Sequence, residues 1–150
     1  GKLKLFEGFI GFFGVIVGTF LTAFYVRKQE RKKIATDLFV TYNSLEFISL
    51  RNSAGSILRQ AFNQQVKLNW SDLHIQLQEN NKWEKVSAVD GFFRTLYELC
   101  SHNLVDVAMA RSLFKDIHNH WYKSYFEIID MESGKKYSTH KRLNTLLNKI

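Results

Sequence analysis

The chain has 150 residues, enough for one compact domain, and contains 13 phenylalanines, a single cysteine and no proline. Its formal net charge of +7 is unevenly distributed: residues 37–134 hold nine basic and twelve acidic side chains, whereas residues 27–36 and 135–150 each hold five basic ones and at most one acidic. This distribution argues against a basic face for duplex nucleic acid, and one cysteine rules out a disulfide framework within the chain.

Near the N-terminus, residues 6–26 are apolar, with no charged side chain between Glu7 and Arg27. As a helix they would span about 31 Å, the thickness of the hydrocarbon core of a bilayer. A secretory signal would have a shorter apolar core and a small-residue cleavage site. We therefore expect a transmembrane helix and its basic juxtamembrane segment over residues 1–33. The positive-inside rule then predicts a single-pass protein of the inner (cytoplasmic) membrane with its C-terminal domain in the cytoplasm.

Small residues recur along one face of this segment, at Gly11, Gly14, Gly18 and Thr22. Small residues let membrane helices approach closely, so the pattern favours transmembrane association and a homo-oligomer. The alternative is that glycine is simply commoner in membrane helices. The basic cluster over 27–33 is expected to contact anionic membrane lipid or to act only as a topology signal.

The cytoplasmic domain is expected over residues 34–150, and its first apolar positions are Ile34, Leu38, Tyr42 and Leu45. Their spacing predicts that the membrane helix continues into the domain as one helix. A polar, small-residue stretch follows over 49–56. Its Arg51 and Asn52 are candidate ligand-binding residues that could face a cavity shared between subunits, and the alternative is a solvated helix face with a mild bend.

The remaining elements also have helical patterns. Ser71 and Asp72 can cap a short helix that ends near Gln78, and a turn follows over 79–82. Apolar positions from Val86 to Cys100 mark the next helix. Asp106 is expected to cap the longest helix of the domain, which should end at 133–134. Thr139 is expected to cap a final basic amphipathic helix. No segment alternates as a strand does, so the fold class is predicted to be all-α, with one N-terminal transmembrane helix followed by a cytoplasmic helical bundle.

No catalytic motif is legible in the chain. It contains no Gly-rich phosphate loop, zinc-protease pair or nucleophile elbow, so we predict that it is not an enzyme and uses no cofactor. Cys100, His102, His118 and His120 are the nearest approach to a metal set, but residues two apart on a helix point in different directions. We therefore predict no metal site.

The most informative polar segment combines four cations, an aromatic ring and two hydroxyls at a predicted helix start: Lys135, Lys136, Tyr137, Ser138, Thr139, His140, Lys141 and Arg142. Cationic side chains and free helix amides favour an anion, and Tyr137 could stack on a base. The segment is therefore a predicted ligand-binding site. The alternative is a solvated basic tail.

The order of parts resembles that of an uncharacterised bacterial family of small single-span proteins with helical cytoplasmic domains. The residues that carry this resemblance are Leu45-Glu46-Phe47, Arg51-Asn52, Gly91-Phe92-Phe93, His102 to Asp106, Leu113-Phe114 and Trp121-Tyr122. Size, topology and basic residues also look like those of a membrane effector of type III CRISPR antiviral defence that cyclic tetra-adenylate activates. This likeness implies an oligomeric sensor that binds a cyclic oligonucleotide and perturbs or permeabilises the membrane, with a pore as one outcome. The alternative function is a membrane-anchored helical adaptor that binds a protein partner and no nucleotide.

Overall fold

The computed structural model describes the backbone of residues 2–64 and 67–149, and within these ranges the side chains from residue 17 onward. Every regular element in them is helical, which confirms the all-α prediction. The elements in chain order are α1 (Lys2–Tyr42), α2 (Leu45–Asn63), α3 (Trp70–Gln76), the 3-10 turn η1 (Glu79–Asn81), α4 (Lys82–Ser101), α5 (Val107–Trp121), the π turn η2 (Tyr122–Phe126), α6 (Glu127–Glu132) and α7 (Thr139–Leu147).

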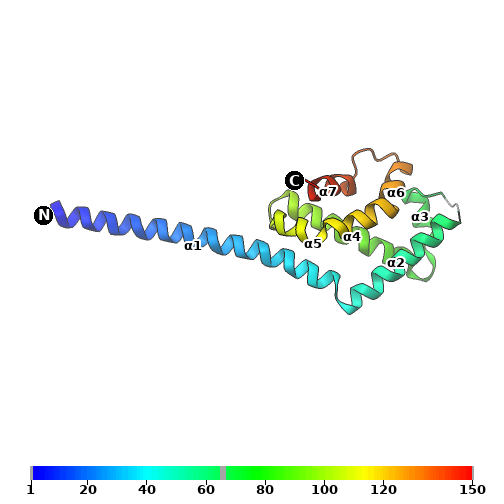
Figure 1. Ribbon diagram of the computed structural model, residues 1–150, viewed down its shortest axis with the longest axis horizontal. Helices are drawn as coiled ribbons and strands as arrows, with labels where there is room; N and C mark the ends of the chain where they lie inside the picture. Colours follow the sequence, from blue (N-terminus) through cyan, green and yellow to red (C-terminus); the bar gives the residue numbers. More distant parts are fainter. Residues whose placement is uncertain (1, 65–66, 150) are drawn as a thin grey trace.

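Helix α1 is a single rod that extends far beyond the rest of the molecule (Figure 1). Its 41 residues correspond to about 61 Å of helix. Side chains 17–30 are all exposed, and the first fully buried one is Ala35, where α1 meets α5. The Asp106 amide, which precedes α5, also donates to the Arg31 carbonyl at 3.2 Å. The prediction of one continuous helix from the N-terminal segment into the domain is thereby confirmed.

Within the part of the chain whose side chains are described, no helix has an apolar stretch long enough to cross a bilayer. The predicted span over 6–26 shares only residues 17–26 with that part. Gly11 and Gly14 also precede that part, whereas Gly18 and Thr22 lie exposed on the rod.

The chain turns sharply between α1 and α2, where the sequence pattern predicted that the helix would run on through Leu45. The Ser44 hydroxyl explains this difference, because it donates to the Thr41 carbonyl at 2.7 Å and accepts from the Phe47 amide at 3.3 Å. It thus ends one helix and caps the next. Leu45 consequently points into solvent rather than continuing the apolar face. We call this turn the elbow.

The core lies between α2, α4, α5 and α7 and is rich in aromatic rings. Helix α4 is central, since it contacts α2, α5 and α7. Its Phe93 is fully buried, and its ring lies within 5.0–6.4 Å of the rings of Tyr42, His118 and Phe126. Burying a phenylalanine contributes about 1.5–3 kcal/mol. The buried phenylalanines Phe93, Phe114 and Phe126 therefore stabilise a small bundle whose single cysteine is free.

The helix predicted after Asp106 does continue to Glu132, but it contains the π turn η2 between α5 and α6. Asp106 does cap α5 as predicted, by accepting from the Met109 amide at 2.8 Å. A π turn places one extra residue in the helix and shifts the phase of its buried face. Tyr122 and Tyr125 within the turn are buried, as is Trp121 just before it. Tyr125 and Tyr122 nevertheless line two different surface hollows.

Candidate functional site

The first of these hollows lies at the elbow and has a volume of about 540 Å³. We call it the elbow hollow. The end of α1 contributes Tyr42, the turn contributes Asn43, and α2 and α5 form the facing walls. Sites for small ligands commonly measure about 300–1,000 Å³. The hollow is therefore large enough for a ligand of nucleotide size.

Arg51 dominates the elbow hollow. Its guanidinium carbon lies 4.5 Å from the centre of the Tyr42 ring, a cation–π contact that fixes the side chain. Its Nε is buried and has no hydrogen-bond partner among the described residues. An unpaired buried donor costs about 1–3 kcal/mol. An anion that accepted from this N–H would recover part of that cost.

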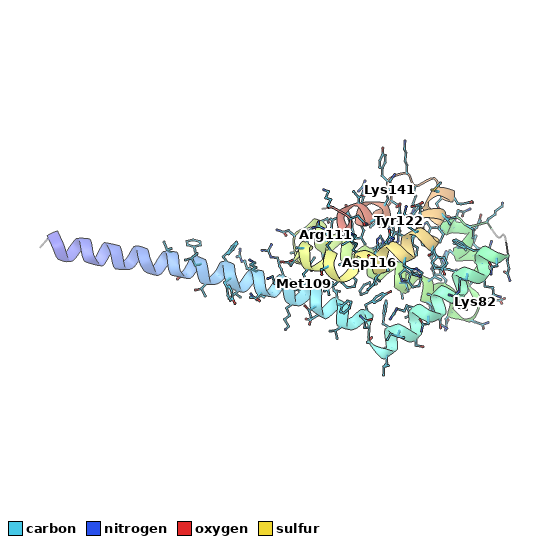
Figure 2. The ribbon with its side chains drawn as sticks, in the orientation of Figure 1. Lys82, Met109, Arg111, Asp116, Tyr122 and Lys141 are labelled. Carbon is cyan, nitrogen blue, oxygen red and sulfur yellow. The ribbon has the colours of Figure 1, made fainter. Side chains whose placement is uncertain are left out.

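The other lining groups give the elbow hollow a positive balance. Arg59 lies on α2, about two turns after Arg51. Asp116 on α5, labelled in Figure 2, is the only lining carboxylate among the described residues. The wall beneath is rigid because the Trp121 indole donates to the Tyr42 hydroxyl at 2.9 Å. Two guanidinium groups on a rigid wall suit phosphate or carboxylate oxygens.

The second hollow, of about 660 Å³, lies between α6, the connection after it and α7. We call it the α6–α7 hollow. Four lysines line it together with two carboxylates: Lys123, Lys135, Lys136, Lys141, Glu127 and Asp130. Lys123 is paired with Glu127 at 2.8 Å. Burial, followed by the charges of Glu127 and Asp130, raises the pKa of Tyr122 to about 12, so its hydroxyl remains protonated at neutral pH.

Tyr137 lies beside the α6–α7 hollow with 69% of its surface exposed. The amines of Lys136 and Lys141 lie 5.9 and 5.7 Å from the centre of its ring. Tyr137, Lys141 and Arg142 line a further depression of about 370 Å³ on the outer side of α7. This face thus offers an exposed ring flanked by cations.

The residues predicted to bind a ligand are divided between these places. Arg51 and Asn52 line the elbow hollow. The α6–α7 hollow receives Lys135, Lys136, Ser138 and Lys141, while Tyr137 and Arg142 face the outer depression. Within one chain, therefore, the two predicted groups do not form one site.

Two residues of the predicted group at 135–142 have internal partners instead. The Thr139 hydroxyl lies 3.3 Å from the Arg94 guanidinium, which donates to it. His140 is fully buried, with its Nε2 2.5 Å from an Asp90 oxygen and its Nδ1 3.4 Å from His118 Nε2. Ser138, rather than the predicted Thr139, caps α7 by accepting from the Lys141 amide at 3.0 Å.

The row of Asp90, His140 and His118 joins α4, α7 and α5 through the core. Burial raises the pKa of Asp90, but the hydrogen bond and charge of His140 and the charge of Arg94 outweigh it, so this pKa lies below its ordinary value of 3.8. Burial, and then the charge of His140, lower the pKa of His118 to about 3. His118 is therefore neutral at physiological pH. Its Nδ1 has no partner among the described residues.

Sequence reasoning missed Arg59, His120 and Trp121 in the elbow hollow and Asp130 in the α6–α7 hollow. Arg51 and Arg59 are about two turns apart on one predicted helix, and this spacing could have indicated that they line the same site. No local pattern indicated that Trp121 or Asp130 would line a hollow. Among the described residues, no three His, Cys, Asp or Glu side chains are grouped as metal ligands would be.

Comparison with known proteins adds no assignment to this geometry. No protein-family model matches the chain, and no curated protein or solved structure is significantly similar to it.

Proposed function

We propose that this chain is a membrane-anchored antiviral effector whose helical domain binds a cyclic oligonucleotide in the elbow hollow and thereby moves its α1 anchor. The observation that carries the proposal is the position of Arg51 and Arg59: the cationic hollow lies at the joint between the rod and the bundle. A ligand there would touch Tyr42 on α1 and the walls from α2 and α5 at once.

The exposed apolar side chains of α1 support a membrane anchor. Phe20 and Phe24 are 73% and 64% exposed, and Leu21 between them is also exposed. Each would gain about 1.5–3 kcal/mol on leaving water, so the rod is stabilised by lipid or by other copies of itself. The basic cluster at 27–33 follows directly, as it does at the cytoplasmic edge of a membrane helix. We propose that the segment over 6–26 crosses the inner membrane and that the domain lies in the cytoplasm.

Ligand chemistry follows from the lining groups. A guanidinium group can donate two parallel hydrogen bonds to the oxygens of one phosphate. Arg51 and Arg59 therefore suit the phosphodiesters of a cyclic oligonucleotide. The side-chain amides of Asn43 and Asn52 lie at the same hollow and can both donate to and accept from a base edge. One hollow admits a ligand of nucleotide size, so we propose to test cyclic tetra-adenylate first, with its nucleotides shared among the elbow hollows of neighbouring chains.

Transmission to the membrane needs only a change in the elbow. A ligand shifts a conformational equilibrium by the difference between its affinities for the two states. If the hollow binds phosphate better at one elbow angle, the ligand favours that angle, and the rigid α1 carries the change to the anchor. Several such anchors acting together would perturb the bilayer.

The proposal is tested with the full chain in a mild detergent and in liposomes. Isothermal titration should give micromolar or tighter binding of cyclic tetra-adenylate, weakened at least about tenfold by Arg51→Met with Arg59→Met. Arg142→Met, an exposed arginine outside the hollow, is the matched control and should bind as the unchanged protein does. Ligand should also release dye from liposomes carrying the protein.

Absence of binding, or equal binding by the double variant, would overturn this function. In the first case the adaptor function, with a protein partner and no nucleotide, would take its place. Binding without dye release would overturn the membrane effect and leave the sensor.

A further inference from the structure

Asp130 in the α6–α7 hollow has a carboxylate oxygen with nothing to bind. The residue is only 3% exposed. Its Oδ1 accepts from the Trp70 indole at 2.7 Å, whereas its Oδ2 is buried and has no hydrogen-bond partner among the described residues. Buried polar atoms are normally paired, so an unpaired oxygen on a residue that lines a cavity indicates a hydrogen-bond donor from outside the chain.

The missing donor is not a metal ion. A cation such as Ca²⁺ or Mg²⁺ would need several oxygen ligands. Glu127, the other lining carboxylate, is already paired with Lys123 at 2.8 Å. The remaining charged residues of the lining are lysines, so the hollow as a whole favours an anionic ligand. Only Asp130 Oδ2 favours a hydrogen-bond donor.

The anionic part of a ligand has its own partners on α7 and on the connection before it. Lys135, Lys136 and Lys141 line the hollow, and none of them forms an ion pair with a described residue. Ser138 caps α7 at the same wall, where the first amides of the helix have no acceptor within it. Figure 2 shows Lys141 and Tyr122 on the same side of the bundle, and both residues line the hollow.

We propose that the α6–α7 hollow is a second binding site, for a phosphate monoester that also carries an amino group. The lysines and the start of α7 bind the phosphate, and Asp130 Oδ2 accepts from the amino N–H. At about 660 Å³ the hollow admits a mononucleotide with an aminated base as well as a smaller aminoalkyl phosphate. The site is separate from the elbow hollow and does not depend on the function proposed for it.

Pairs of probes that differ at the amino group give the test. The pairs are cytidine and uridine monophosphate, adenosine and inosine monophosphate, and O-phosphoethanolamine and 2-hydroxyethyl phosphate. Titrated calorimetrically into the full chain in detergent, the aminated member of at least one pair should bind about tenfold more tightly or better. A preference in the nucleotide pairs alone, or in the alkyl pair alone, identifies the source of the ligand.

Variants separate the two halves of the site. Asp130→Asn, which presents an amide N–H where the free oxygen was, should abolish or reverse the amino preference. Lys135→Met with Lys136→Met should weaken both members of a pair equally and leave the preference intact. Arg51→Met with Arg59→Met should change neither affinity, which distinguishes this site from the elbow hollow.

Equal affinity for both members of every pair would overturn the proposal, as would the absence of binding by every probe at millimolar concentration. These results need only the unchanged protein, so they hold even if Asp130→Asn weakens folding through its bond to Trp70. Retention of the preference by a folded Asp130→Asn protein would also overturn it.

Discussion

Lowering the pH from 7 to 5 should destabilise the domain because His118 is held neutral in the core. Burial and then the charge of His140 lower the pKa of His118 from 6.5 to about 3. Between these values the unfolded chain binds a proton at this residue and the folded chain does not. The free energy of unfolding therefore falls as the pH falls through this window.

The expected size follows from the two pKa values. At pH 5, which is 1.5 units below the pKa of 6.5, the imidazole of the unfolded chain is almost fully protonated. This protonation favours the unfolded state by about 2 kcal/mol. At pH 7 the same contribution is only about 0.2 kcal/mol. Asp90 acts elsewhere: its pKa lies below 3.8, so the stability that it contributes is lost only at still lower pH.

The assay is urea unfolding of the full chain in a non-ionic detergent, followed by tryptophan fluorescence at pH 7 and pH 5. His118→Gln cannot take up a proton, and its amide can still face His140, so its loss of stability should be smaller than that of the unchanged protein by about 2 kcal/mol. His120→Gln, an exposed histidine on the same helix, is the control and should lose as much as the unchanged protein. A difference below about 0.5 kcal/mol between the His118→Gln and unchanged proteins would refute the reasoning.

Three further outcomes are expected. Asp106→Ala removes the cap of α5 and should lower the free energy of unfolding by about 1 kcal/mol, whereas an unchanged urea midpoint would show that the cap contributes nothing. Phe93→Ala should cost about 3–5 kcal/mol in the same measurement, and a cost under about 1 kcal/mol would contradict its full burial. Burial raises the pKa of the Cys100 thiol to about 11, so Ellman's reagent at pH 8 should react about 100-fold more slowly with the folded protein than in urea; equal rates would mean that the thiol is accessible.

The helical elements could be predicted from the sequence because their apolar spacing is regular and their caps are local. Asp106 was expected to cap α5 and does so. The break after α1 was missed because the apolar spacing continues through Leu45, while the hydroxyl of Ser44, one residue before it, decides the backbone path. The phase shift at η2 was missed for a similar reason, since a π turn depends on tertiary packing around Trp121 and Tyr125.

The candidate sites were predictable only as chemistry, not as geometry. The cations at 135–142 and Arg51 were recognised from their types, and the sequence could not show that they line different hollows. His140 was grouped with the surface cations because its partners, Asp90 and His118, are 50 and 22 residues away in the chain. Long-range pairing of this kind leaves no local pattern.

The unbroken course of α1 also fixes the rotational phase between the outer part of the rod and the domain. An α-helix turns by about 100° per residue, so Val17 and Phe24 project on the same side as Ala35, the side that carries the bundle. Gly18 and Thr22 project about 120° away from it. Copies that met through Gly18 and Thr22 would hold their domains at the rim of the assembly, clear of one another. Inserting one residue within 27–33 would rotate each domain by about 100° around the axis of α1 relative to Gly18 and Thr22.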